Sequence, residues 1–335
     1  MDYNKVYHLS HTDLDGYSCQ LIASEVFKDI EFFNSNYGQE IVERLEQITS
    51  KAKEGDLVLI TDLNLDEDGA KYIDEKSKEK GFEILLLDHH KTGESLAEKY
   101  KWYNLDVTRS ATKITYDYFE SDKISHLKEY VNSVNAYDIW LQEEVERFEL
   151  GKVLARYVTE AKEINRIMFS KENYEYISYM LKKAMEMVGK EDAYIVLDDS
   201  LHSVKKSFFL KDKNSTLENL VSSYIVDLLT KNKEAMSVYY KDKKGILTYS
   251  VGNTSIIGNA FLKENPEFDF FLDINGRKNI SARANDKYDV SLMAKELFGG
   301  GGHANAAGGR FGDFKDSFIY EKIKEQVQEL MKENS

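Results

Sequence analysis

The sequence predicts an α/β fold with two domains. Three observations carry this prediction. Between residues 4 and 90, short apolar segments typical of strands alternate with segments whose apolar residues have helical spacing. After a long helical stretch, strand-like segments return beyond residue 235. The chain of 335 residues is also longer than one typical domain. Strands that alternate with helices favour a parallel sheet covered by helices on both faces, and we expect this in the N-terminal domain.

The N-terminal elements follow one another closely. Apolar residues with helical spacing, such as Leu21, Ile22 and Val26, predict the helices, and Gly81 is a common type of helix stop. The continuous apolar run at 56–62 is typical of a strand buried on both faces. The predicted strands are 4–10, 30–34, 56–62 and 82–90, and the predicted helices are 16–29, 38–53 and 66–81.

The remainder of the chain predicts a helical region and then a smaller α/β domain with a mixed sheet. Residues 110 to 190 are expected to be mostly helical, and the polar segment 211–216 marks a break in the helical stretch that follows. We place the domains at 1–190 and 236–335, with a helical connector at 191–235. Predicted strands in the second domain are 235–240, 245–251, 268–275 and 278–285, with helices at 254–265, 289–298 and about 315–333.

Composition limits the classes of partner. The net charge of −14 argues against a duplex DNA-binding surface, because binding to phosphates needs a cationic face. No apolar run approaches the roughly 20 residues of a membrane-spanning helix, and the N-terminal residues lack the pattern of a secretory signal. The single cysteine, Cys19, cannot form an internal disulfide. We therefore expect a cytoplasmic protein without membrane partners, and leave a homodimer open.

Acidic and histidine residues gather where predicted strands or helices end. If the first strands are parallel neighbours, most of these residues converge on one edge of one sheet. Each alone has an ordinary structural explanation, since an aspartate after a strand is usually a turn residue or a helix N-cap. Their joint occurrence favours a site. The residues are His11, Asp13 and Asp15 in "SHTDLDG", Asp62 after "DLVLIT", Asp88, His89 and His90 in "DHH", and Asp138 in "NAYDIW".

Such a set of side chains is chemically suited to divalent cations. Carboxylates that converge on one edge repel one another unless cations lie between them. Mixed imidazole and carboxylate ligands favour Mn²⁺, Zn²⁺ or Fe²⁺. Two such ions can share a bridging carboxylate, activate a water molecule and bind a phosphoryl oxygen. The pattern therefore predicts phosphoester hydrolysis.

A second motif lies near the C-terminus, in "FGGGGHANAAGGR". Glycines permit a close approach of the backbone to a ligand, and the N–H groups of a glycine-rich loop can bind an anion. We expect a loop in which Gly300, Gly301, Gly302 and His303 contact phosphate. Arg283 is the other candidate, because its planar guanidinium matches phosphate oxygens. The alternatives are a flexible linker for the glycines and a surface strand position for the arginine.

The ordered motifs DxDG, DHH and GGGH resemble those of the DHH phosphoesterase superfamily, in the branch with the DHH-associated C-terminal domain. The resemblance spans nearly the whole chain. It implies two divalent cations, most often Mn²⁺, with Asp62 bridging them. The residues that it implies as ligands are His11, Asp13, Asp15, Asp62, His89 and Asp138; those that it implies at the substrate are His90, Arg109, Arg283, Gly300, Gly301, Gly302 and His303.

Two details of this resemblance concern single residues. Many family members place the first histidine four residues before the first aspartate, whereas His11 precedes Asp13 by two. His11 is therefore either a direct ligand or a hydrogen-bond partner of a ligating carboxylate. Asp88 is expected to support the imidazoles or their loop. Asp62, His90 and His303 are the predicted catalytic residues.

The resemblance implies a Mn²⁺-dependent phosphoesterase that hydrolyses short single-stranded oligonucleotides one nucleotide at a time, as nanoRNases do. Alternatives within the family are a phosphatase of 3'-phosphoadenosine 5'-phosphate and a cyclic mono- or dinucleotide phosphodiesterase. A family II pyrophosphatase shares the N-terminal motifs and lacks GGGH. A nucleotide-binding regulatory protein without turnover is the alternative outside enzymes.

Overall fold

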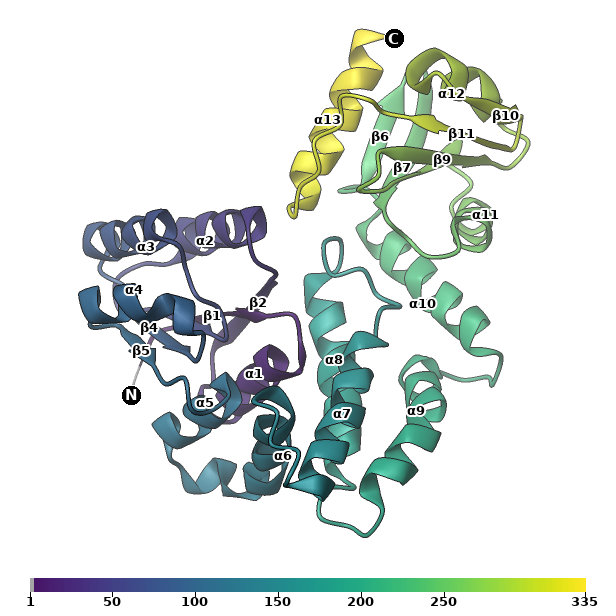
Figure 1. The fold of residues 1–335 in the computed structure, drawn as a ribbon. Coiled ribbons are helices and arrows are strands. Elements are labelled where there is room, and N and C mark those ends of the chain that lie inside the picture. Colours follow the sequence, from purple (N-terminus) through teal and green to yellow (C-terminus); the bar gives the residue numbers. More distant parts are fainter. Residues whose placement is uncertain (1–2) are drawn as a thin grey trace. The chain divides into compact units, whose positions relative to one another are not determined.

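Figure 1 shows the computed structural model, which describes residues 3–335. The chain divides into two compact units. The first consists of Met1–Ala161 and Tyr174–Val204, and the second of Lys162–Asn173 and Lys205–Ser335. Within residues 3–335, no helix combines the length and the apolar character that crossing a membrane requires.

The first unit is built on a five-stranded sheet in the order β2-β1-β3-β4-β5, in which every neighbouring pair is parallel. The predicted parallel sheet is therefore confirmed. The register places Leu9 opposite Ile60, and Ile60 opposite Leu86, in the middle of the sheet. The strands are β1 (Val6–His11), β2 (Ile30–Ser35), β3 (Leu57–Thr61), β4 (Glu83–Asp88) and β5 (Tyr103–Leu105).

Successive residues of the central strands pack on opposite faces of this sheet. On one face, Val58 and Ile60 belong to an apolar core with residues of α2, α3 and α4. On the other face, Leu57 and Leu59 belong to a core with residues of α1 and α5. Helices therefore cover both faces of the sheet (Figure 1). Because side chains on both faces are buried, the sequences of these strands are continuously apolar.

Several helices of the first unit begin or end at residues that commonly cap helices. Asp13, Asp66 and Ser110 accept a backbone hydrogen bond as N-caps of α1, α3 and α5, and Gly81 ends α3 in the left-handed conformation. Helices of this unit are α1 (Leu14–Val26), α2 (Gln39–Lys51), α3 (Glu67–Lys80), η1 (Lys91–Gly93), α4 (Glu94–Lys99), α5 (Ala111–Phe119), η2 (Asp122–Leu127), α6 (Lys128–Asp138) and α7 (Val145–Thr159).

The long helical stretch continues through three further helices. The boundaries between the two units fall after Ala161, inside α8 (Ser170–Met185) and inside α9 (Ala193–Phe209). The helix α10 (Leu217–Asn232) belongs to the second unit. The sequence predicted helices here, and the polar segment between α9 and α10 is a break as expected.

The second unit has a six-stranded mixed sheet in the order β10-β11-β9-β8-β7-β6, in which only the β7–β8 pair is parallel among the described strands. This confirms the predicted mixed sheet. Its strands are β6 (Ser237–Tyr240), β7 (Lys243–Tyr249), β8 (Phe270–Ile274), β9 (Asn279–Ala284), β10 (Gly301–His303) and β11 (Ala306–Arg310). Its remaining helices are α11 (Thr254–Glu264), α12 (Val290–Phe298) and α13 (Tyr320–Glu333).

The prediction of a loop for the glycine-rich segment is wrong. Residues 301–303 and 306–310 form the antiparallel strands β10 and β11, with Gly301 opposite Gly308 and Gly302 opposite Ala307. β11 continues into the sheet by pairing with β9. Glycine has a low intrinsic preference for strands, so the sequence indicated a loop, but tertiary pairing with β9 outweighs that preference.

Candidate metal centre

The order of the strands brings the acidic and histidine residues of the first unit together. β1, β3 and β4 are adjacent and parallel, so their carboxyl ends meet at one edge of the sheet. His11 ends β1, Asp62 follows β3, and His89 follows β4. Asp13 and Asp15 lie at the start of α1, and Asp138 is the last residue of α6.

The local backbone at Asp13, Gly16 and Asp62 shapes this edge of the sheet. Asp13 caps α1 by accepting a hydrogen bond from the backbone N–H of Gly16 at 3.0 Å. A Cβ atom at Gly16 would collide with the backbone carbonyl of His11, so only glycine fits the fourth position of DxDG. Asp62 has a left-handed backbone with φ of 55°, which is uncommon for a residue other than glycine and marks a position worth a functional explanation.

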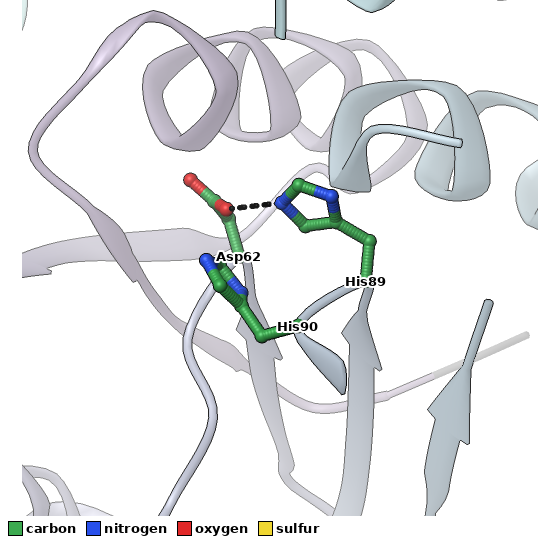
Figure 2. Close-up of side chains that lie close together, drawn as sticks. All are labelled: Asp62, His89 and His90. Atoms are coloured by element: carbon green, nitrogen blue, oxygen red, sulfur yellow. Dashed lines mark ion pairs between the residues drawn. The ribbon is translucent and has the colours of Figure 1, made fainter. Parts of the chain in front are cut away.

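Three overlapping groups of side chains have ligand atoms within 4.8 Å of one another. Figure 2 shows Asp62, His89 and His90, with Oδ1 of Asp62 at 3.4 Å from Nε2 of His89. The same nitrogen lies 3.5 Å from Oδ2 of Asp138 and 3.8 Å from Oδ2 of Asp15. The groups are Asp62, His89 and His90; His11, Asp13 and Asp62; and Asp15, His89 and Asp138.

His11 lies against two carboxylates. Its Nδ1 is 2.9 Å from Oδ2 of Asp13 and 3.7 Å from Oδ2 of Asp62. Burial disfavours the charged imidazole, but these two carboxylates outweigh burial and raise the pKa of His11 to about 10. The two carboxylates therefore favour the protonated form of His11.

Asp15 is oriented by the N-terminus of α5. Its Oδ2 accepts a hydrogen bond from the backbone N–H of Ala111 at 2.7 Å, and its Oδ1 accepts one from that of Thr112 at 2.9 Å. The hydroxyl of Thr112 also donates to the backbone oxygen of Asp15. The positive end of the helix dipole therefore faces this buried carboxylate. The start of α5, which follows Arg109, thus positions Asp15.

The carboxylates of the centre are hard to ionise together. Burial, and after it the neighbouring charges of Asp15 and Asp13, raise the pKa of Asp62 well above its ordinary value. Burial and the charge of Asp15 raise the pKa of Asp138 to about 8. Oδ2 of Asp62 and Oδ2 of Asp138 are buried and lack a hydrogen-bond partner in the described part of the chain.

These features match what divalent cations require. A cation between the carboxylates removes their mutual repulsion and supplies a partner for both unpaired oxygens. Three histidines and four aspartates make the mixed imidazole and carboxylate donor set that suits transition-metal ions. The residues therefore fit a divalent-cation site.

His90 contacts Asp88, which the sequence predicted to support the imidazoles, and Tyr37, which the sequence did not identify. Its Nδ1 lies 2.7 Å from Oδ1 of Asp88, and its Nε2 lies 3.2 Å from the hydroxyl of Tyr37. The other oxygen of Asp88 accepts a hydrogen bond from the hydroxyl of Tyr103 at 2.6 Å. No motif in the sequence marked Tyr37 or Tyr103 among the 22 tyrosines.

Arg109 lies in the first unit, and its guanidinium is already paired with acidic side chains. Its guanidinium forms ion pairs with Asp106, at 2.7 Å, and with Asp117. It is thus part of a local charge network at the start of α5. A role for Arg109 at substrate phosphate remains a prediction.

The remaining predicted substrate residues lie in the second unit. Arg283 in β9 and His303 in β10 are both register partners of Ala306 in β11, so their side chains share one face of the sheet. The guanidinium of Arg283 donates to the backbone oxygen of Ala282 and to the hydroxyl of Ser255. His303 is exposed, as are Gly301 and Gly302. This face thus presents two nitrogen-rich side chains on either side of a small residue.

Comparisons with known proteins agree with this description. No model of a protein family matches the chain. It is 41% identical to a 3',5'-cyclic-nucleotide phosphodiesterase of Helicobacter pylori over 97% of this chain and 98% of that protein. It is 29% identical to the oligoribonuclease NrnB of Bacillus subtilis over 90% of this chain and 72% of that protein.

A solved structure supports the fold along its whole length. The crystal structure of an uncharacterized protein from Helicobacter pylori G27 matches with a TM-score of 0.91 and 40% identity, covering 98% of this chain and 99% of that one. Together with the motifs DxDG, DHH and GGGH and their places in the two sheets, the likeness to the phosphodiesterase over nearly the full chain is decisive. The chain belongs to the DHH phosphoesterase superfamily, and both of these named relatives are phosphoric ester hydrolases.

Proposed function

We propose that this protein is a Mn²⁺-dependent phosphodiesterase of small nucleotides, with a 3',5'-cyclic nucleotide as its first candidate substrate. The observation that carries the proposal is the 41% identity, over nearly the whole of both chains, to a 3',5'-cyclic-nucleotide phosphodiesterase. It changes the order of the substrates that the sequence motifs suggested, in which short oligonucleotides came first.

Two cation sites are proposed from the groups of the centre. His11, Asp13 and Asp62 would hold one divalent cation, and Asp15, His89 and Asp138 would hold the other, with Asp62 shared between them. His11 is assigned as a direct ligand because its Nδ1 faces both Asp13 and Asp62. When bound, the cations supply a Lewis acid for phosphate oxygens and lower the pKa of coordinated water.

The chain's own groups would bind and orient the phosphodiester. His90 is hydrogen-bonded to Asp88 through Nδ1, and its Nε2 lies 3.2 Å from the hydroxyl of Tyr37. We assign His90 to orienting a phosphate oxygen of the substrate. Arg283, His303 and Gly300 to Gly302 are proposed to bind the substrate phosphate, since a guanidinium and an imidazole on one sheet face can both donate to its oxygens.

A second candidate is hydrolysis of short single-stranded oligonucleotides. It is favoured by the 29% identity to an oligoribonuclease over 72% of that protein. The two reactions break the same type of bond, so one centre can serve either. The shape of the nucleoside pocket decides between them.

The experiment that tests the proposal compares substrates under one set of conditions. The protein with Mn²⁺ is given 3',5'-cyclic AMP, RNA of two to five nucleotides, 3'-phosphoadenosine 5'-phosphate, a cyclic dinucleotide and pyrophosphate. We expect the highest kcat/KM for 3',5'-cyclic AMP and no turnover by Asp62→Ala. A higher kcat/KM for RNA would select the second candidate, and binding without turnover of any substrate would favour a regulatory nucleotide-binding protein.

A further inference from the structure

We propose that Tyr103 is a positioning residue for phosphoester hydrolysis. Acting through Asp88, it holds the imidazole of His90 in one orientation and one tautomer. The inference rests on the proposed function in one respect, namely that His90 contacts the substrate phosphate. The geometry of the three side chains stands independently of the substrate.

The three residues form a continuous chain of hydrogen bonds. The hydroxyl of Tyr103 donates to Oδ2 of Asp88 at 2.6 Å, and Oδ1 of Asp88 lies 2.7 Å from Nδ1 of His90. Asp88 is fully buried, and Tyr103 is 4% exposed. The two carboxylate oxygens of Asp88 thus have different partners, and neither is left unpaired.

This arrangement determines which nitrogen of His90 carries the proton. A carboxylate only accepts hydrogen bonds, so Nδ1 of His90 must donate to Asp88. In the neutral ring, Nε2 then carries a lone pair. The hydroxyl of Tyr37 lies 3.2 Å from this nitrogen and 3.4 Å from Nδ1, so Nε2 is the ring nitrogen that can accept a hydrogen bond from it. Fixing the tautomer of a catalytic histidine through a buried carboxylate has large effects on rate in other hydrolases.

The site is shaped to admit the hydroxyl of Tyr103. β5 pairs with β4 so that Tyr103 lies opposite Leu86, two residues before Asp88. A Cβ atom at Gly93 would collide with the hydroxyl and the ring of Tyr103. A phenylalanine would fill the apolar core equally well, so burial alone does not explain the hydroxyl or the glycine that makes room for it.

The Tyr103→Phe variant removes only this hydroxyl. The buried Asp88 then has one unpaired oxygen and turns towards another donor, because an unsatisfied buried carboxylate is costly. We expect kcat for bis-p-nitrophenyl phosphate to fall about 10- to 100-fold, the size typical when a hydrogen-bond partner behind a functional group is lost. KM and the Mn²⁺ affinity should change by less than about threefold, since the proposed ligands keep their places.

The decisive readout is the ¹⁵N NMR signature of His90 in the full chain without metal, assigned with the variant His90→Gln. The wild type should show a proton on Nδ1, and Tyr103→Phe should show a mixture of tautomers. Tyr157→Phe is the matched control. It removes another buried phenol hydroxyl, which donates to the backbone oxygen of Leu197 in the same unit, and should leave the His90 signature and kcat as in the wild type.

Gly93→Ala is a second variant that should break the hydrogen bond between Tyr103 and Asp88. Its methyl group would collide with the Tyr103 side chain, while Tyr103, Asp88 and His90 all keep their side chains. It should reproduce the NMR change and the fall in kcat. A wild-type His90 signature in both variants would overturn the inference, and so would a fall in kcat that comes with weaker Mn²⁺ binding and an unchanged signature. If the signature changes while the wild type hydrolyses no substrate, the positioning of His90 stands and the proposed function fails.

Discussion

Nε2 of His89 lies 3.4 Å from Oδ1 of Asp62, and the two residues follow neighbouring parallel strands. The same nitrogen also lies within 3.8 Å of carboxylate oxygens of Asp15 and Asp138. One imidazole nitrogen can donate a single hydrogen bond, so three carboxylates around it exceed what a proton can satisfy. A divalent cation satisfies all of them, which makes this relationship the physical basis of the proposed centre.

Cation binding should stabilise the first unit. Because a bound ion removes the repulsion among the buried carboxylates, Mn²⁺ at about 100 times its Kd should add about 2.7 kcal/mol to the free energy of unfolding for each of the two proposed sites. The measurement is thermal or urea unfolding with Mn²⁺ and with a chelator. Asp62→Ala should lose this stabilisation, whereas Asp68→Ala, at an exposed position of α3, should keep it. Equal stabilisation in both variants would contradict the assignment of Asp62.

Gly16→Ala should damage the centre although it changes no predicted ligand. The added methyl group would collide with the backbone of His11 and move the end of β1 away from Asp13. We expect a fall in Mn²⁺ affinity of about 10-fold or more, measured by titration calorimetry. Gly312→Ala is the control, since its Cβ would meet open space. Unchanged affinity in Gly16→Ala would show that the loop adapts.

Acid should destabilise the first unit through His8. This residue is fully buried in β1, with Nε2 at 2.9 Å from the hydroxyl of Thr61, and burial lowers the pKa of His8 to about 3 from its ordinary value of 6.5. Above pH 6.5 the ring is neutral in both states. Below pH 6.5 the unfolded chain takes up a proton that the folded chain does not, so stability is lost as pH falls towards 3.

The loss from His8 should reach about 2 kcal/mol at pH 5, which is one and a half pKa units below 6.5. It can be measured as urea unfolding at pH 7 and pH 5 in the presence of a chelator. Fluorescence reports on the first unit, because Trp102 and Trp140 both lie in it. His8→Phe should show a smaller difference between the two pH values. The same difference in wild type and variant would assign the acid sensitivity to other groups.

Arg283 and Arg109 should differ in their effect on substrate binding. The guanidinium of Arg283 donates to two neutral oxygens, whereas Arg109 is already paired with Asp106 and Asp117. Arg283→Ala should therefore raise KM about 10-fold or more, because hydrogen bonds from a charged group to phosphate are strong. Arg109→Ala should change KM less than about threefold. A larger rise in KM for Arg109→Ala would place its guanidinium at the substrate instead.

The sequence could predict the first sheet because local and tertiary preferences agree there. Continuous apolar runs such as 56–62 are buried on both faces, and the glycines and N-cap residues mark the intervening helices. The convergence of Asp62 and His89 follows from one rule, that parallel neighbours end at the same edge. Residues 301–310 show the opposite case, in which a glycine-rich segment becomes two strands because β9 offers an unpaired edge.

By itself, the sequence determined the α/β class, the three motifs and the set of acidic and histidine residues, because strand periodicity and side-chain chemistry are local properties. Only the tertiary structure decided that the N-terminus of α5 orients Asp15, that Arg109 is paired with acids, that Tyr37 lies beside His90, and that Tyr103 donates to Asp88. The contacts of Asp15 with α5 and of Tyr37 with His90 join residues far apart in the chain, and their partners are common residue types. Nothing in the local pattern therefore distinguishes Tyr103 from the tyrosines that merely fill a core.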